Sequence, residues 1–278
     1  MAIITISRQL ASLGDETANE LAKLLDYRFV DKQSLEERIK SYGVAGHKLE
    51  KYDERKPSFF ASLSQDRDDY LHYLKTAMLT EAGEGSCVFI GRGAAAVFKN
   101  MPVVLSVFLV APMDIRCERV KSYFHCDDKR ARQIIEQSDR DRLGFHRYFF
   151  DIDWRDSSNY HITLNTGNLH PSIAAKIIKE LRDQAIGSDV EAQNTKRLKE
   201  MTLGQQIIHH ILYEKQIPIH FLEAAVDLQS NADGEVTLFG VANSQALVEA
   251  AVSAARDLTG VSGVRSEIQV VQEYSVMP

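Results

Sequence analysis

The chain has 278 residues, of which 44% are hydrophobic and 26% are charged, and its formal net charge at pH 7 is −6. This length and composition predict a globular protein with one large domain or two smaller ones. The negative charge excludes the basic excess that nucleic-acid binding requires, so no nucleic-acid partner is expected. No stretch approaches the ~20 apolar residues of a membrane span, and three cysteines without a CxxC pair fit a reducing compartment. A cytoplasmic location without a transmembrane segment is therefore expected.

The first 186 residues alternate between strand-like and helix-like stretches, an order typical of a parallel sheet with crossover helices. The predicted strands are Ile3–Ile6, Cys87–Ile90, Val103–Val110 and Tyr160–Asn165. The predicted helices are Thr17–Leu25, Lys32–Ser41, Asp66–Ala82, Asp114–Phe124, Asp128–Phe149 and Pro171–Gln184. The pattern predicts an α/β domain over residues 1–186.

The chain changes character after Ile186. Residues 187–199 are polar and lack an apolar period, so they are interpreted as a linker. Residues 200–278 are predicted to form a small α+β domain in the order αββαβ, with an Asp-Gly hairpin signal at its first turn. Its predicted elements are a helix at Leu203–Glu214, strands at Phe221–Gln229 and Glu235–Val241 around a turn at Asn231–Gly234, a helix at Ser244–Leu258 and a strand at Arg265–Val271.

The segment between Ser7 and Thr17 carries the clearest chemical signal. The first strand runs into Ser7-Arg8-Gln9-Leu10-Ala11-Ser12-Leu13-Gly14 and then into a helix. Helix N-termini present unpaired N–H groups and a positive dipole end, which suit a phosphate. Against the pattern GxxxxGK[ST], however, Gly14 holds the lysine position and Asp15 the position of the magnesium-binding Ser or Thr. Two interpretations are open: a phosphate-binding loop, or an ordinary turn in which Ser12 or Asp15 caps the helix.

Several later segments resemble the cytidylate kinase family in order and spacing. They are Val88–Phe98 with Gly91-Arg92-Gly93, the strand Val103–Val110, and Pro112–Arg119. The segments Ile4–Gly14, Asp139–Arg142, Tyr148–Trp154 and Asn159–Gly167 resemble its cytidylate kinase-like branch. The resemblance covers about residues 1–185. It implies a P-loop NTPase-like parallel sheet with flanking helices and a helical lid.

The resemblance also implies an activity: phosphoryl transfer from ATP, with Mg²⁺, to a nucleoside monophosphate, CMP or dCMP being favoured. The residues implied at the donor phosphates are Ser7, Arg8, Ser12, Gly14, Asp15 and Thr17. Asp15 is also a candidate Mg²⁺ ligand, because hard cations prefer carboxylate oxygens. The residues implied at the acceptor are Asp31, Arg92 and Asp139. The implied catalytic residues are Arg140, Arg142 and Arg147 of the lid, because an arginine over the transferring group neutralises developing charge.

Other interpretations of the same residues are open. An arginine-rich helix is also typical of a solvated face with i,i+4 ion pairs. Asp15 and Glu16 are also typical of a first helical turn that needs no ligand. The missing lysine removes a contact worth roughly 1.5–3 kcal/mol, so a catalytically weak nucleotide-binding sensor is the alternative to an enzyme.

The C-terminal region resembles a BON domain, a small module associated with phospholipid or ligand binding. The resemblance is carried by Gly234–Ala242, Ala250–Ala255 and Gly260–Val264. It implies a phospholipid or protein partner and gives a third hypothesis, an interaction protein whose first domain regulates the second. His209 and His210 are adjacent on one predicted helix and face different directions, so no metal site is expected there.

Overall fold

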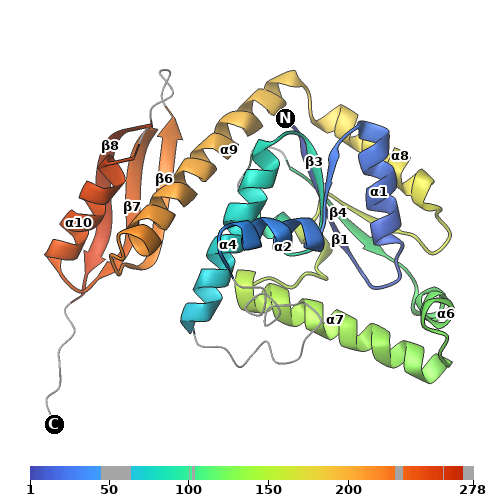
Figure 1. Cartoon of the computed structure of the whole chain (residues 1–278). Helices are drawn as coiled ribbons and strands as arrows, with labels where there is room; N and C mark the ends of the chain where they lie inside the picture. Colours follow the sequence, from blue (N-terminus) through green and yellow to red (C-terminus); the bar gives the residue numbers. More distant parts are fainter. Residues whose placement is uncertain (45–63, 100, 102–103, 229–233, 259, 272–278) are drawn as a thin grey trace, which may run out of the picture. The chain divides into compact units, whose positions relative to one another are not determined.

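The computed structural model describes residues 1–44, 64–99, 101, 104–228, 234–258 and 260–271 (Figure 1). The chain divides into two compact units, Met1–Asn194 and Thr195–Pro278. The division falls inside the expected linker 187–199, and most of that segment is helical, because helix α9 (Ser188–His209) begins there. Val190, Asn194 and Leu198 lie one helical turn apart and are partly or fully buried. One buried residue per helical turn, of which one is an asparagine, is too few to give the sequence an apolar period. The segment therefore resembled a linker.

A five-stranded parallel sheet forms the centre of the first unit, in the order β2-β3-β1-β4-β5. The strands are β1 (Ile3–Arg8), β2 (Arg28–Val30), β3 (Cys87–Ile90), β4 (Leu105–Val110) and β5 (Ile162–Asn165). The predicted parallel α/β sheet is confirmed. The sequence did not predict β2, because three residues are too few to show a strand period.

Helices cover both faces of this sheet. They are α1 (Gly14–Leu25), α2 (Lys32–Ser41), α4 (Ser64–Gly83), α5 (Ala94–Val97), α6 (Met113–Phe124), α7 (Asp128–Phe150) and α8 (Pro171–Ala185), with a 3₁₀ turn at Ser157–Asn159. Helices α1 and α8 lie side by side on one face (Figure 1), where Leu21 and Ile178 are buried against Ile6 and Val107. Two aromatic residues near the end of α7 belong to the core: Phe149 is buried, and Trp154 is buried with its ring 5.3 Å from that of Phe108.

The second unit is a three-stranded mixed sheet covered on one face by helices. Helix α9 continues into a π-helical turn, η3 (His210–Glu214), and the later elements are β6 (His220–Leu228), β7 (Gly234–Ala242), α10 (Gln245–Arg256) and β8 (Val261–Val270). Strands β6 and β7 are antiparallel, whereas β8 pairs with β7 in parallel after the α10 crossover. The predicted αββαβ order is confirmed. Of the predicted turn Asn231–Gly234, only Gly234 lies within the described residues.

No helix in the described part of the chain has both the length and the apolar character needed to cross a bilayer.

Candidate nucleotide-binding site

The residues that the sequence singled out follow the carboxyl ends of neighbouring parallel strands. Arg8 ends β1, Asp31 follows β2 directly, and Arg92 lies two residues beyond β3. Thr166 follows β5 and donates a backbone hydrogen bond to the carbonyl of Val110, the last residue of β4. Ligands of open α/β sheets bind at this edge. The fold therefore brings the expected donor and acceptor residues to the same edge of the sheet.

The loop between β1 and α1 leaves the start of α1 without a side-chain cap. Leu13, the residue before the helix, has left-handed backbone angles (φ 56°) and its side chain makes no capping hydrogen bond. The hydroxyls of Ser12 and Thr17 donate instead to the carbonyls of Gln9 (2.9 Å) and Leu13 (2.7 Å). The interpretation of Ser12 or Asp15 as a helix cap is therefore wrong. Both hydroxyls stabilise the loop from within, and neither caps the first-turn N–H groups of α1.

Three successive carbonyls of this loop accept hydrogen bonds from side chains far along the chain. Arg116 donates through Nε to Leu10 (2.8 Å), and Arg119 donates through Nη1 to Ala11 (2.9 Å). Thr166 donates through Oγ1 to the carbonyl of Ser12 (2.7 Å). In a trans peptide the carbonyl and the next N–H point in opposite directions. Anchoring the carbonyls of Leu10 and Ser12 therefore directs the N–H groups of Ala11 and Leu13 away from the side chains of Arg116 and Thr166.

Sequence reasoning assigned no role to the two arginines of α6. Arg116 is 2% exposed, and Arg119 also donates to the carbonyl of Thr166 (2.8 Å). The available signal was their spacing of three residues, which places both on one face of a helix that begins directly after β4. They fix the shape of the loop between β1 and α1.

Gly14 holds the lysine position of the P-loop pattern because Arg8 fills the adjacent space. A Cβ atom on residue 14 would lie 2.4 Å from Cγ and 2.6 Å from Cβ of Arg8, closer than such atoms approach. The Arg8 guanidinium lies 3.4 Å from the Asp15 carboxylate through Nη2 and Oδ1. Arg8 therefore supplies a positive charge at the loop that carries no lysine.

The residues present fit a single-carboxylate Mg²⁺ site better than a complete protein cage. No group of three Asp, Glu, His or Cys side chains that could hold a metal occurs within the described ranges. Asp15 has an exposed side chain on the first turn of α1. Mg²⁺ is usually held by one or two carboxylates together with substrate phosphates and water. Asp15 would be its protein ligand.

Arg92, expected at the acceptor, is 4% exposed and has a left-handed backbone (φ 55°). Its Nη2 lies 3.1 Å from Oε1 of Glu36, and its Nη1 donates to the hydroxyl of Tyr70 at 3.4 Å. The guanidinium also lies over the ring of Phe145, 6.0 Å from its centroid. Asp31 caps α2, because its Oδ1 accepts hydrogen bonds from the N–H (2.9 Å) and hydroxyl (3.0 Å) of Ser34. Glu36 is a site residue that the sequence did not identify.

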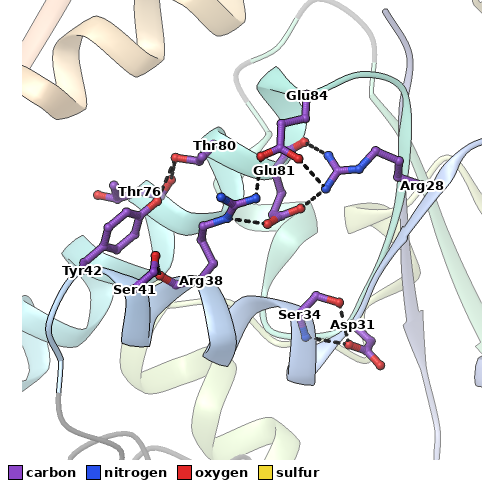
Figure 2. A network of polar contacts seen from close by, with 10 residues as sticks. All are labelled: Arg28, Asp31, Ser34, Arg38, Ser41, Tyr42, Thr76, Thr80, Glu81 and Glu84. Carbon is purple, nitrogen blue, oxygen red and sulfur yellow. Dashed lines mark hydrogen bonds and ion pairs between the residues drawn. The ribbon is translucent and has the colours of Figure 1, made fainter.

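A network of four charged residues joins β2, α2 and α4 (Figure 2). Glu81 of α4 is 4% exposed and pairs with Arg28 of β2 and, at 2.7 Å, with Arg38 of α2. Glu84 pairs with the same two arginines, at 2.9 Å from Arg28. The hydrogen bond to Glu81 raises the pKa of Arg38 above its usual value. Strand β2, helix α2 and helix α4, which carry or flank Asp31 and Glu36, are thereby joined to one another.

Helix α7, the expected lid, does not present its candidate residues together. Arg116 binds both carboxylate oxygens of Asp139 (2.8 and 2.9 Å), which engages this expected acceptor residue with α6. Arg142 is 5% exposed and donates to the hydroxyl of Ser138 (2.6 Å). Arg140 and Arg147 are exposed, seven residues apart on one helix face, and form ion pairs with Glu136 (3.8 Å) and Asp153 (3.6 Å). Of the three candidate arginines on α7, Arg140 and Arg147 are exposed and Arg142 is buried.

A cavity of 280 Å³ lies beside the loop between β1 and α1. It is lined by Leu10 of the loop, by Phe124 at the end of α6, and by side chains of α7, including Ile134, Gln137 and Asp141. Its volume approaches the ~300 Å³ at which small-molecule pockets begin.

Comparisons with known proteins place both units. The model of the cytidylate kinase-like family matches residues 3–168, and the model of the BON domain matches residues 203–272. The chain is 39% identical over 75 residues to a cytidylate kinase of Sulfolobus acidocaldarius, covering 27% of this chain and 41% of that protein. It is 25% identical over 132 residues to a cytidylate kinase of Methanopyrus kandleri, covering 45% of this chain and 68% of that protein.

The fold has a counterpart among solved structures. A crystal structure of an uncharacterized protein from Eubacterium ventriosum is similar with a TM-score of 0.53 at 22% identity, over 66% of this chain and 99% of that one. The match to the Sulfolobus enzyme spans less than half of that relative's length. The family model, in contrast, matches more than half of this chain and ends just beyond Asn165-Thr166-Gly167. The chain therefore belongs to the cytidylate kinase-like family and carries a BON domain over residues 203–272.

Proposed function

We propose that the unit Met1–Asn194 transfers the γ-phosphoryl group of ATP to a nucleoside monophosphate, with CMP or dCMP as the acceptor that the family favours. The single observation that carries this proposal is the loop before α1. Its carbonyls are anchored by Arg116, Arg119 and Thr166, and the helix that follows has no side-chain cap. A helix start built in this way suits a polyphosphate.

The remaining residues divide the work by their chemistry. Arg8 contributes charge at the donor phosphates, and Arg92 grips the acceptor monophosphate, because a guanidinium forms paired hydrogen bonds with phosphate oxygens. Arg140 and Arg147 neutralise charge that develops on the transferring group once α7 approaches it. Asp15 would hold a Mg²⁺ ion at this loop, and the ion would offset the negative charge of the donor phosphates.

A coupled assay of phosphate transfer from ATP to CMP, dCMP, UMP and AMP tests the proposal. Turnover with CMP or dCMP above the other acceptors is the expected result. Tight ATP binding without transfer to any acceptor would replace the enzyme by a nucleotide-binding sensor. Absence of ATP binding would contradict both the enzyme and the sensor.

The role of Asp15 needs a separate measurement. We expect Mg²⁺ to tighten ATP binding by the wild type more than by Asp15→Asn, which keeps the shape of the side chain and loses its charge. Asp183→Asn is the control, because that carboxylate pairs with Lys179 on the exposed side of α8. An equal effect of Mg²⁺ on the wild type and both variants would remove Asp15 as a ligand.

For the second unit we propose a basic segment of a partner protein as the ligand. Helices α9 and α10 bury one face of the sheet, and the opposite face is exposed. Alternation along the strands places on this open face the charged residues Glu223, Asp227, Glu235, Glu267 and Arg265. Phe239, 41% exposed, lies between its register partners Glu223 and Glu267. An aromatic ring between two carboxylates suits a lysine or arginine side chain, whereas four carboxylates oppose an anionic lipid surface.

Full-length protein tests this second proposal. We expect it to bind a lysine-rich peptide in low salt and to lose that binding in the double variant Glu223→Lys, Glu267→Lys. Glu249→Lys is the control, because Glu249 is an exposed residue of α10 and the substitution makes the same kind of charge change. Flotation with anionic liposomes, together with failure to bind the peptide, would overturn the proposal in favour of a phospholipid ligand.

A further inference from the structure

Arg92 is a buried cation just beyond the carboxyl end of β3, and its guanidinium already pairs with a carboxylate of the protein, that of Glu36. Glu36 accepts a hydrogen bond from Nη2 at 3.1 Å, while Tyr70 and Phe145 contact other parts of the group. The guanidinium is 4% exposed and Glu36 is 29% exposed. The carboxylate therefore lies on the more solvent-exposed side of the pair, the side from which a ligand can approach.

Glu36 lies between two cations. Its Oε1 is 3.1 Å from Nη2 of Arg92 and 3.6 Å from Nζ of Lys32, one turn earlier on α2. Lys32 is more exposed than Arg92, at 44% against 4%. A carboxylate released from Arg92 would thus retain a cationic partner without any movement of the helix backbone.

We propose that Glu36 sets the affinity for the acceptor by occupying Arg92 until a phosphate monoester displaces it. The inference rests on the proposed function, because it takes Arg92 as the acceptor's phosphate ligand. A phosphate monoester carries nearly two negative charges at pH 7 and three acceptor oxygens, so it binds a guanidinium more strongly than one carboxylate does. Ligands with a single negative charge and fewer oxygens gain less from the exchange and are disfavoured. Glu36 is then a specificity-determining residue that favours phosphate monoesters.

The fixed position of α2 supports this arrangement. The ion pairs of Arg38 with Glu81 and Glu84 tie the helix to α4, so Glu36 remains within reach of Arg92 after it is displaced. The competition is therefore intramolecular and present in every molecule. If Glu36 occupies Arg92 in about nine molecules of ten, the apparent dissociation constant is raised about tenfold.

The test is equilibrium binding of CMP and, separately, of inorganic phosphate to the full chain without ATP. Glu36→Gln keeps the size of the side chain and removes its charge. We expect it to bind CMP about tenfold more tightly than the wild type does. Glu37→Gln is the matched control, because that neighbouring carboxylate is exposed and accepts a hydrogen bond from Gln33. It should leave the affinity unchanged.

A third variant separates displacement from general electrostatics. In an Arg92→Lys background the gain from Glu36→Gln should largely disappear, because the bidentate guanidinium is absent, whereas a general charge effect would persist at full size. Affinity for both probes that is unchanged or weaker in Glu36→Gln would overturn the inference, as would failure of both proteins to bind either probe. If phosphate binds more tightly to Glu36→Gln while CMP binds neither protein, the displacement stands and the nucleotide acceptor of the proposed function falls.

Discussion

The side chain of Arg8 lies against the α-carbon of Gly14, so closely that a methyl group on residue 14 would meet Cγ of Arg8 at 2.4 Å. The two positions are therefore coupled. A P-loop lysine at residue 14 and the present arginine at residue 8 exclude each other.

This coupling predicts that restoring the lysine lowers nucleotide binding. Gly14→Lys should weaken ATP binding and reduce the free energy of unfolding by about 1–3 kcal/mol, as overpacking does. Isothermal titration with ATP and thermal unfolding measure the two effects. Gly187→Lys, where no atom lies within 4 Å of the new Cβ, is the control. Adding Arg8→Gly to Gly14→Lys removes both the Cβ and the Cγ that a side chain at residue 14 would meet, so it should recover stability. Tighter ATP binding by the single variant would contradict the prediction.

Arg119 predicts a binding defect that originates outside the ligand site. Arg119→Ala removes the hydrogen bonds to Ala11 and Thr166, and charged hydrogen bonds are worth ~1.5–3 kcal/mol each. We expect ATP affinity to fall about tenfold and the melting temperature to drop. Arg132→Ala is the control, since that arginine pairs with Asp128 on the exposed side of α7. Loss of stability without loss of ATP affinity would show that the loop keeps its shape without this anchor.

The arginines of α7 should separate into two classes. Arg140→Ala and Arg147→Ala should lower kcat about 10- to 100-fold with unchanged melting temperature, because both side chains are exposed and each would act on the transferring group. Arg142→Ala should lower the melting temperature, since Arg142 is buried. Steady-state kinetics with thermal unfolding distinguish the classes. A kcat unaffected by either exposed arginine would leave α7 with a structural role alone.

Asp153 predicts a pH dependence of stability. Hydrogen bonds from Arg155 hold the pKa of Asp153 at about 2, below its usual 3.8. A depressed pKa means that the stabilisation is complete above about pH 4 and is lost as the pH falls toward 2. Because this carboxylate is one third exposed, we expect Asp153→Asn to cost only about 1 kcal/mol at pH 7. Unfolding titrations from pH 7 to 3 should show the difference from the wild type shrinking, and a constant difference would contradict this origin.

The three thiols should differ in reactivity. Cys87 and Cys117 are buried, whereas Cys126 is partly exposed. Burial also raises the pKa of Cys87 to about 12, so almost none of it is thiolate at pH 8. A thiol reagent should therefore label one cysteine in the native protein and all three after unfolding. Rapid native labelling of Cys87 would show that β3 opens.

The sequence predicted the parallel sheet because strand-like runs such as Ile3–Ile6 and Cys87–Ile90 alternate with helix-like stretches, the order typical of such sheets. It also located the loop between β1 and α1, since a strand passing directly into a helix is a local pattern. It missed the partners of that loop. Arg116 and Thr166 meet the loop only after the chain has crossed the sheet, and no local spacing records such a contact. Glu36 was missed for the same reason, because its partner Arg92 is 56 residues away.

The paired carboxylates Glu81 and Glu84 have a consequence for motion. They hold β2 and α2 to the long helix α4 (Figure 2). Strand β2 and helix α2 should therefore open to solvent only when the sheet itself unfolds. Amide hydrogens of α2 should then exchange as slowly as those of the central strands, although the helix has only ten residues. Any closure over bound nucleotides would then require movement of α7, while α2 stays in place.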